Sequence, residues 1–372
     1  QVGRAVAIFT AEEKRSAENI VYSQRGLSTS IPSNPLANVA WPDPAQHTGP
    51  YPAIIWVAGG YWQSLGGPEF NGFPDEHLEA VEQGYVSMMI NSASSVAAWP
   101  AQIWDVKSAI RWIRANADRL NVDTSKIAVV GYSSGGHLAL LAGLTQKSES
   151  HGGTYAHTAT GDNGQGTDIT LGFERSTKDK YFELDAASRK FRLYKQNVQE
   201  ESDVDLVVTW SAPTNLNIDC DDPALPANTC NGQAVDALQK LFDKGTYGTY
   251  DEAALALATE ASPVAYLGND GSEIPGARDI PMMLIQGDAD TLVTPYHGQV
   301  MRDAIAANYG GNPQNLKNNY QYIELEGEGH SYGDAARQVA ADFTFQFINQ
   351  HFKGGSSNYD CTGKNCNLES WD

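Results

Sequence analysis

The residues best suited to carry out chemistry in this chain surround the serine at position 133. The pentapeptide GYSSG at 131–135 follows the apolar run KIAVV and precedes the apolar run HLALLAGL. A serine hydroxyl becomes an effective nucleophile when a neighbouring base removes its proton and when it projects from an unobstructed turn. Small residues on either side of the serine allow such a turn between a strand and a helix. The pattern predicts a nucleophilic Ser133, and the alternative is an ordinary glycine-rich turn.

A second glycine-rich segment could stabilise a negative oxygen on a substrate. The segment AGGYW at 58–62 directly follows the apolar run YPAIIWV. Glycines let backbone N–H groups turn toward a developing oxyanion, and one such donor contributes roughly 3–4 kcal/mol of transition-state stabilisation. The N–H of the residue after the nucleophile, here Ser134, normally completes such a hole. An ordinary Gly-Gly turn is the alternative interpretation.

A nucleophilic serine also needs a histidine base and a carboxylate that orients it. On the architecture to which this turn belongs, the acid and then the histidine follow the serine along the chain. The segment LIQGDADTLVTP offers Asp288 and Asp290, and Asp290 is the predicted acid because it lies further into the loop. Asp288 is expected to cap the turn. His330, in the loop segment EGEGHSYG after a predicted strand, is the predicted base.

The other histidines near these motifs have simpler interpretations. His297 begins a helical pattern, and His351 ends the last predicted helix. His137 lies within the apolar helix that follows Ser133, which favours a packed structural histidine. His330 therefore stays the predicted base.

Two aromatic side chains flank the glycine-rich segments. Trp62 ends the first segment, and Tyr132 immediately precedes the predicted nucleophile. An aromatic ring beside an active site either stacks on the substrate or forms part of the wall of the site. Both residues are predicted to bind substrate, with the wall as the alternative.

Short apolar runs typical of buried strands alternate with helical patterns along most of the chain, which predicts an α/β fold with a mainly parallel sheet flanked by helices. The carboxyl ends of such strands are where ligands gather, so the serine, acid and histidine are expected to meet there. The predicted strands start near Tyr51, Tyr85, Ser125, Asp205, Pro281 and Tyr320, and the clearest helices span about 75–84, 101–117 and 334–351.

The chain is predicted to form a single domain over 1–372 with two insertions and a tail. Residues 146–202 are Gly/Thr/Asp-rich at first and then carry a charged helical pattern; a structureless loop of this length is unusual, so a cap or lid is expected. Its GDNGQGTD stretch departs from EF-hand spacing, which favours a solvated loop over a calcium site. The second insertion spans 217–249, and the polar tail spans 354–372.

The cysteines form two close pairs, Cys220 with Cys230 in the second insertion and Cys361 with Cys366 in the tail. Neither pair has a histidine beside it, so two local disulfides are expected rather than a metal site. Disulfides are typical of an oxidising compartment. Because the chain also begins with Gln, we expect a processed protein that is secreted or periplasmic.

Composition narrows the classes of partner. The chain has 372 residues, of which 41% are hydrophobic, and this is enough to bury a sizeable core. Its net charge of −20 would repel phosphate backbones and anionic lipids, so neither nucleic acid nor a membrane surface is an expected partner. No apolar stretch reaches the roughly 18 residues of a membrane-spanning helix. The sequence leaves the oligomeric state open.

With these motifs in place, the chain resembles the α/β-hydrolase esterases and lipases, specifically the bacterial carboxylesterases grouped with acetyl-xylan, feruloyl-ester and hormone-sensitive-lipase-like enzymes. Further matching phrases are WPAQIWDVKSAIRWIRANADRLNVDTSKIAVVGYSSGGHLALLAG, WSAPTNL, SPVAYL and GDADTLVTP, which lie between Tyr51 and Phe352. The resemblance implies hydrolysis of a small-molecule or polymer-linked carboxylic ester through an acyl-enzyme intermediate, without a metal or organic cofactor. It implies a Ser133 nucleophile, an Asp290 acid, a His330 base and oxyanion donors at Gly60, Tyr61 and Ser134.

One departure from the family pattern concerns the oxyanion segment. Such enzymes usually begin this segment with histidine, whereas this chain has Ala58. The hydrogen bond that the histidine would supply must therefore come from elsewhere.

Two other functions fit parts of the pattern. A serine peptidase of the prolyl-oligopeptidase type shares the triad and the style of the acid loop, but such enzymes usually carry a large preceding domain, and only about 50 residues precede the first core strand here. A non-catalytic binding protein on a hydrolase scaffold would typically lack a member of the triad. The esterase interpretation is therefore preferred.

Overall fold

A computed structural model provides the structure of the chain. It describes residues 15–22, 36–62, 72–91, 99, 101–145, 155–159, 169–173, 181–185, 190–194, 202–217, 232–242, 257–267, 280–310, 312–356 and 359–368.

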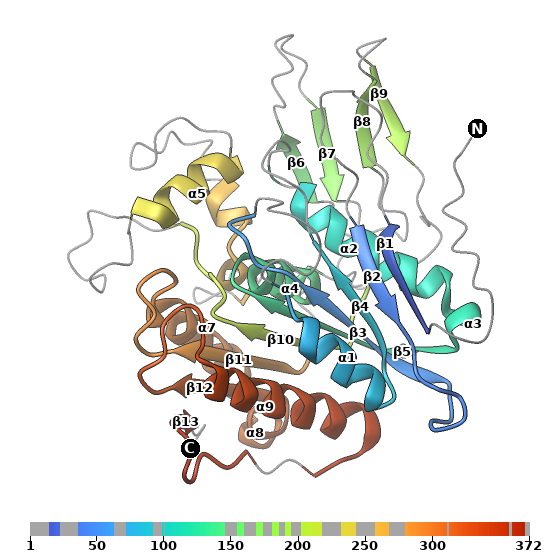
Figure 1. Ribbon diagram of the computed structural model, residues 1–372. Helices are drawn as coiled ribbons and strands as arrows, with labels where there is room; N and C mark the ends of the chain where they lie inside the picture. The colour runs from blue at the N-terminus through green and yellow to red at the C-terminus, as the bar shows by residue number, and fades with distance from the viewer. Residues whose placement is uncertain are drawn as a thin grey trace.

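The centre of the molecule is a nine-stranded sheet (Figure 1). Its strands are β1 (Ser16–Val21), β2 (Leu36–Ala40), β3 (Tyr51–Val57), β4 (Val86–Ile90), β5 (Val122–Tyr132), β10 (Leu206–Trp210), β11 (Met282–Gly287), β12 (Tyr320–Leu325) and β13 (Cys366–Leu368). In space they follow the order β1-β2-β4-β3-β5-β10-β11-β12-β13. The strands from β4 to β12 pair in parallel, whereas β1, β2 and β13 pair antiparallel at the two edges. The predicted mainly parallel α/β sheet is confirmed.

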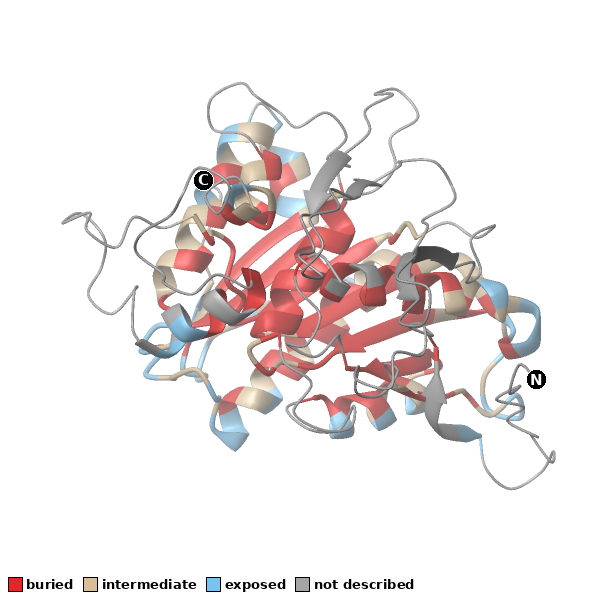
Figure 2. Ribbon diagram, turned by 90° about the horizontal axis from the view of Figure 1, so that it is seen from above, coloured by how far each residue is buried: buried red, intermediate tan, exposed pale blue. Residues whose placement is uncertain are grey.

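Helices cover both faces of this sheet. They are α1 (Pro74–Glu82), α2 (Ala101–Ala115), α3 (Ala117–Leu120), α4 (Ser134–Leu144), α5 (Gly232–Phe242), α7 (Pro295–Tyr309), α8 (Pro313–Asn319) and α9 (Asp334–Lys353), with a 3-10 helix at Pro263–Leu267. Side chains of α2, α4 and α7 pack in one hydrophobic core, and those of α1 and α9 pack in a second core on the opposite face. Figure 2 shows the buried sheet between the two layers.

Burial on both faces explains why the central strands read as continuous apolar runs. In β3, Ile55 and Val57 belong to the first core, whereas Ile54 and Trp56 belong to the second. Strands with two covered faces need apolar residues at every position rather than at alternate ones. All six strands expected from apolar runs are present, and the helix expected to close near Gly84 ends at Glu82.

The helical pattern expected late in the first insertion is wrong where the structure describes that segment. Residues 181–185 and 190–194 form the antiparallel strands β8 (Tyr181–Asp185) and β9 (Lys190–Tyr194), and an earlier hairpin pairs β6 (Tyr155–Ala159) with β7 (Ile169–Phe173). The sequences of β8 and β9 alternate apolar and charged residues, and the register sets Glu183 opposite Arg192. An alternating sequence pattern of this kind favours strands over a helix.

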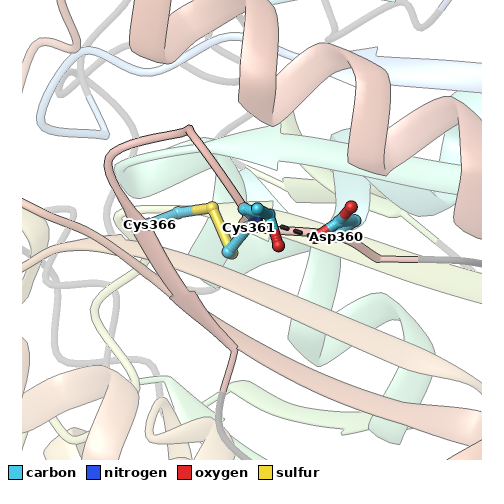
Figure 3. The surroundings of a disulfide bond; sticks show 4 residues. Asp360, Cys361 and Cys366 are labelled. Atoms are coloured by element: carbon cyan, nitrogen blue, oxygen red, sulfur yellow. Dashed lines mark hydrogen bonds between the residues drawn. A yellow bond between two sulfur atoms is a disulfide. The ribbon is translucent and has the colours of Figure 1, made fainter.

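The tail ends on the sheet. Cys361 and Cys366 form the expected disulfide, next to the hydrogen bond from the Thr362 N–H to the Asp360 side chain (Figure 3). Cys366 begins β13, which pairs with β12 and covers its outer edge. Cys220 and Cys230, the other expected pair, lie outside the described residues. Among the described helices, none combines the length and apolar character needed to cross a bilayer.

Candidate active site

Ser133 occupies a sharp turn between β5 and α4, with φ 54° and ψ −126°. A non-glycine residue with positive φ costs on the order of 1–2 kcal/mol, so neighbouring contacts must hold it. The Ser133 N–H donates to the Trp210 carbonyl at 2.8 Å. A Cβ on Gly131 would lie 2.2 Å from the Gly135 carbonyl oxygen, and a Cβ on Gly135 would lie 2.1 Å from the Val57 carbonyl oxygen. Both glycines of the motif are therefore required by close backbone approaches.

The structure brings Ser133, His330 and Asp290 into one chain of hydrogen bonds. The His330 Nε2 atom lies 2.9 Å from Ser133 Oγ, and His330 Nδ1 lies 2.8 Å from Asp290 Oδ2. Because an ionised carboxylate only accepts, the Nδ1–H donates to Asp290, and in the neutral imidazole Nε2 is left to accept from the serine hydroxyl. Asp290 follows β11 and His330 follows the adjacent parallel strand β12, so both loops emerge at the same edge of the sheet.

The Asp290 carboxylate is buried and fully engaged. Its Oδ1 accepts from the N–H groups of Leu292 at 2.8 Å and Val293 at 2.9 Å, while its Oδ2 also accepts from Gln286 Nε2 at 3.3 Å. The same Gln286 amide donates to the Val293 carbonyl at 2.8 Å. These contacts leave the carboxylate one orientation, with Oδ2 toward the imidazole of His330.

Neighbouring side chains hold the loop that carries His330. The Tyr132 hydroxyl donates to the His330 carbonyl at 3.0 Å, and the two rings lie 5.2 Å apart. Burial raises the pKa of Tyr132, so the hydroxyl keeps its proton and acts as the donor. The Tyr332 hydroxyl donates to the Ile285 carbonyl at 3.0 Å and accepts from Ser211 Oγ. Tyr132, predicted to bind substrate, thus has its hydroxyl engaged with the histidine loop.

The predicted oxyanion segment runs beside the nucleophile. A Cβ on Gly59 would lie 2.9 Å from Tyr132 Cδ1 and 3.1 Å from Ser133 Cβ, so a side chain here would require its neighbours to shift. The next three residues all have positive φ: 129° at Gly60, 56° at Tyr61 and 57° at Trp62. Consecutive left-handed residues other than glycine are unfavourable, so other contacts must hold this segment.

Trp62 and His137 meet beneath this segment. Trp62 is 6% exposed, and its indole Nε1–H donates to His137 Nδ1 at 2.9 Å. His137 is fully buried, and desolvation lowers its pKa to about 4. The expected packing of His137 in the core is therefore seen, and Trp62 contributes a buried wall with little surface available to a ligand.

His297 is the other buried histidine near the site. Its Nδ1 accepts from the Thr214 N–H at 3.3 Å, and its carbonyl accepts from the Thr214 hydroxyl at 2.6 Å. Burial lowers the pKa of His297 to about 4. This neutral histidine joins the start of α7 to the loop after β10, next to the acid loop.

The sequence reasoning missed two supporting residues, Gln286 and Tyr332, and gave a third, Asp288, a different role. The sequence offered a signal for Gln286, because it is a polar residue near the end of an otherwise apolar strand, just before the acid loop. Asp288, expected to cap its own turn, instead accepts from the Gly327 N–H of the histidine loop. Tyr332 carried no separable sequence signal, because its contacts depend on strands that are distant in the chain. Within the described part of the chain, no group of three or more His, Cys, Asp or Glu side chains could hold a metal.

Comparisons with known proteins identify a family and several similar esterases. The family model described as BD-FAE matches residues 42–305. Esterase LipC of Mycobacterium tuberculosis is 43% identical over 99 residues, which are 26% of this chain and 24% of that protein. Esterase LipQ of the same organism is 40% identical over 95 residues, 25% of this chain and 22% of that protein. The matched region thus spans only about a quarter of these curated relatives.

Solved structures match over most of the chain. A truncated carbohydrate esterase from gut microbiota has a TM-score of 0.59 and 24% identity, over 90% of this chain and 96% of that one. The butyrate-bound esterase Est2 of Thermogutta terrifontis has a TM-score of 0.53 and 19% identity, over 90% of this chain and 94% of that one. At these identities, the likeness establishes a shared fold.

Proposed function

The chain belongs to the BD-FAE family and has the α/β-hydrolase fold, and on that premise we propose that it hydrolyses carboxylic esters through an acyl-enzyme intermediate on Ser133. The observation that carries the proposal is the relay from Ser133 Oγ through the His330 imidazole to the Asp290 carboxylate, with separations of 2.9 Å and 2.8 Å. A serine at a strained turn, bonded to a histidine that a buried carboxylate orients, is the arrangement that acyl transfer requires.

In the acylation half-reaction, His330 Nε2 takes the hydroxyl proton as Ser133 Oγ bonds to the ester carbonyl carbon. The carbonyl oxygen becomes an oxyanion, which accepts hydrogen bonds from backbone N–H groups. When the tetrahedral intermediate collapses, the bond to the alcohol oxygen breaks, and His330 returns the proton to the departing alcohol. Asp290 stays ionised and stabilises the imidazolium that forms between these two steps.

In the deacylation half-reaction, water takes the place of the alcohol. His330 removes a proton from the water as its oxygen attacks the acyl carbon, and a second oxyanion forms. Collapse releases the carboxylic acid and returns the proton to Ser133 Oγ. The enzyme thus regains its starting protonation state.

The oxyanion donors in this proposal are the N–H groups of Gly60, Tyr61 and Ser134. Gly60 and Tyr61 lie in the segment that passes the nucleophile, and Ser134 begins α4. Prepositioned donors of this kind need no reorganisation as charge develops, which makes them effective in a site shielded from water.

For the substrate, we propose an ester with a small acyl group on a carbohydrate or another small alcohol. The names of the structural neighbours support this class, because they include a carbohydrate esterase and a butyrate-bound esterase. The net charge of −20 disfavours polyanionic substrates. Acetylated xylan belongs to this class, whereas feruloyl sugars and long-chain triglycerides carry larger acyl groups, so a comparison of activity on the three tests the proposed acyl preference.

The proposal also covers the compartment in which the protein works, which we propose is an oxidising one. The disulfide between Cys361 and Cys366 supports a secreted or periplasmic location, since reducing compartments keep such thiols free. The test is the thiol titre of the protein purified from its native host under alkylating conditions. A free thiol at Cys361 would contradict this location.

The test of the reaction combines a substrate panel with active-site labelling. Short p-nitrophenyl esters should be hydrolysed, whereas proline-linked anilides should not, which separates an esterase from a prolyl peptidase. A fluorophosphonate should label the wild type on Ser133, and Ser133→Ala should be neither labelled nor active. A wild type that hydrolyses no ester and takes up no label would contradict the proposal and favour a binding role.

A further inference from the structure

The segment 58–62 must keep an unfavourable shape without the side chain that usually begins it. Gly60, Tyr61 and Trp62 all have positive φ, and Ala58 has only a methyl group, so it cannot donate a side-chain hydrogen bond. At the start of the segment, the Ala58 N–H donates to the Ile90 carbonyl at 3.1 Å. This contact holds the first residue of the segment. The backbone N–H groups of Gly60 and Tyr61 lie further along, so a second contact is needed at the other end of the segment, at Trp62.

The Trp62 side chain supplies that support. Its indole is buried, donates through Nε1–H to His137 Nδ1 at 2.9 Å, and meets the imidazole edge to face with ring centres 5.3 Å apart. Phenylalanine could fill the same space but could not form the hydrogen bond. The chemistry of the contact therefore selects tryptophan as donor and a neutral histidine as acceptor.

The second ring nitrogen of His137 sets which nitrogen accepts. His137 Nε2 lies 2.6 Å from the Ala261 carbonyl, so its proton sits on Nε2 and Nδ1 is free to accept from Trp62. The Ala261 N–H is itself bonded to the Leu257 carbonyl at 2.9 Å. Burial keeps the imidazole neutral by lowering its pKa to about 4. The acceptor is thus held from both sides.

His137 also belongs to the element that carries the nucleophile. It lies one helical turn after Ser133 in α4, and its backbone N–H donates to the Ser133 carbonyl at 3.1 Å. A single rigid turn therefore joins the attacking hydroxyl to the group that holds Trp62. The distance between the nucleophile and the oxyanion segment is set by this turn.

We infer that His137 is a positioning residue, which holds the segment 58–62 through the Trp62 indole so that the N–H groups of Gly60 and Tyr61 face the oxyanion. His137 thereby supplies the support that a histidine at the start of the segment would give, at the position where this chain has Ala58. This inference rests on the proposed ester hydrolysis, because an oxyanion forms only if that reaction occurs.

The experiment compares Trp62→Phe, His137→Phe and the double variant. Two measurements are made: kcat and KM with p-nitrophenyl butyrate, and the inhibition constant of an alkylthio trifluoromethyl ketone, whose serine adduct places an oxyanion in the hole. A misplaced donor weakens binding of the transition state and its analogue but spares ground-state binding. We expect each single variant to lower kcat about 10–100-fold and to weaken the ketone by the same factor, with KM nearly constant. The double variant should lose no more activity than His137→Phe alone, because both substitutions remove the same Trp62–His137 hydrogen bond.

Two further variants separate positioning from general packing. In His137→Asn, the amide oxygen stands where Nδ1 stood and can accept from Trp62, so activity should recover relative to His137→Phe. Trp112→Phe makes the same ring change at a partly buried tryptophan near the end of α2, packed on the same core, and should leave kcat unchanged.

The results that would contradict the proposed function differ from those that would contradict the role of His137. A wild type without esterase activity would contradict the proposed function. An active wild type together with a Trp62→Phe variant of unchanged kcat and unchanged ketone affinity would overturn the role of His137. If His137→Phe does not fold, the Trp62→Phe and His137→Asn pair still decides the question.

Discussion

Asp288, in the loop after β11, accepts a hydrogen bond at 2.7 Å from the backbone N–H of Gly327, in the loop after β12. The Ala289 N–H adds a second link, to the Glu328 carbonyl at 3.0 Å. Two hydrogen bonds, formed just after β11 and β12 end, therefore join the loop that carries the acid to the loop that carries the histidine. Asp290 and His330 extend from this joined pair.

The two aspartates of this loop should respond differently to substitution. Asp290→Asn should lower kcat about 10⁴-fold, because an amide no longer holds the imidazole in the required tautomer. Asp288→Ala should lower the free energy of unfolding by about 1 kcal/mol and lower kcat only a few-fold, since it loosens the loops without touching the imidazole. Asp288→Asn keeps the accepting oxygen and serves as the control. Equal losses of kcat in Asp290→Asn and Asp288→Ala would mean that the acid is misassigned.

Acid should destabilise the protein through its buried histidines. Burial lowers the pKa of His77, His137 and His297 to about 4, below the ordinary value of 6.5. The unfolded chain binds more protons between these two values, so the stabilisation is complete above pH 6.5 and is lost as the pH falls toward 4. Each histidine should contribute on the order of 3 kcal/mol to this loss.

His77 is the best histidine for measuring this effect, because it lies in α1 and its Nδ1 bonds to Ser87 Oγ at 2.7 Å, outside the site. Urea unfolding of the wild type and of His77→Gln should be followed between pH 4 and pH 7 on the same buffer series. The variant should be less stable at pH 7 but should lose less stability on acidification. Parallel curves for the two proteins would show that His77 does not titrate in this way.

The glycines of the nucleophile turn should tolerate no side chain. In Gly135→Ala, the new methyl would lie 2.1 Å from the Val57 carbonyl oxygen, so either the strand end or α4 must move. We expect a loss of at least about 3 kcal/mol in unfolding free energy or a failure to accumulate folded protein. Gly355→Ala, whose Cβ would lie 3.4 Å from the nearest atom, is the matched control and should be near neutral. Stability is followed by thermal melting.

An ion pair joins α1 and α9, the two helices that pack in the second core. Arg337 in α9 lies 2.7 Å from the buried Glu76 carboxylate in α1, and its guanidinium packs over Trp210 and Phe73. Arg337→Met should destabilise the protein by about 2 kcal/mol, because it leaves a buried carboxylate without its partner. Adding Glu76→Gln should recover part of the loss, which denaturant titration of both variants would measure. An equally unstable double variant would mean that the arginine acts only by packing.

The local parts of this protein could be predicted from the order of its residues. The turn at Ser133 follows from two glycines placed between an apolar strand and an apolar helix, because close backbone contacts there exclude any side chain. The central strands were recognisable because a sheet covered on both faces needs continuous apolar runs. Asp290 and His330 could be proposed from the sequence because each stands in a loop after a predicted strand, and they follow Ser133 in the order acid, then histidine.

What the sequence alone could not decide were the partners that residues meet across the fold. Asp288 was expected to cap its own turn, and its actual partner depends on β11 and β12 being neighbours. The hairpin of β8 and β9 is a different case: its pairing is local, and the alternation of apolar and charged residues was a sequence signal for strands that the helical interpretation overlooked. The Trp62 to His137 contact, like that of Asp288, exists only because the end of β3 and the start of α4 converge in space. Tertiary structure decides such contacts, since they depend on the order of strands in the sheet.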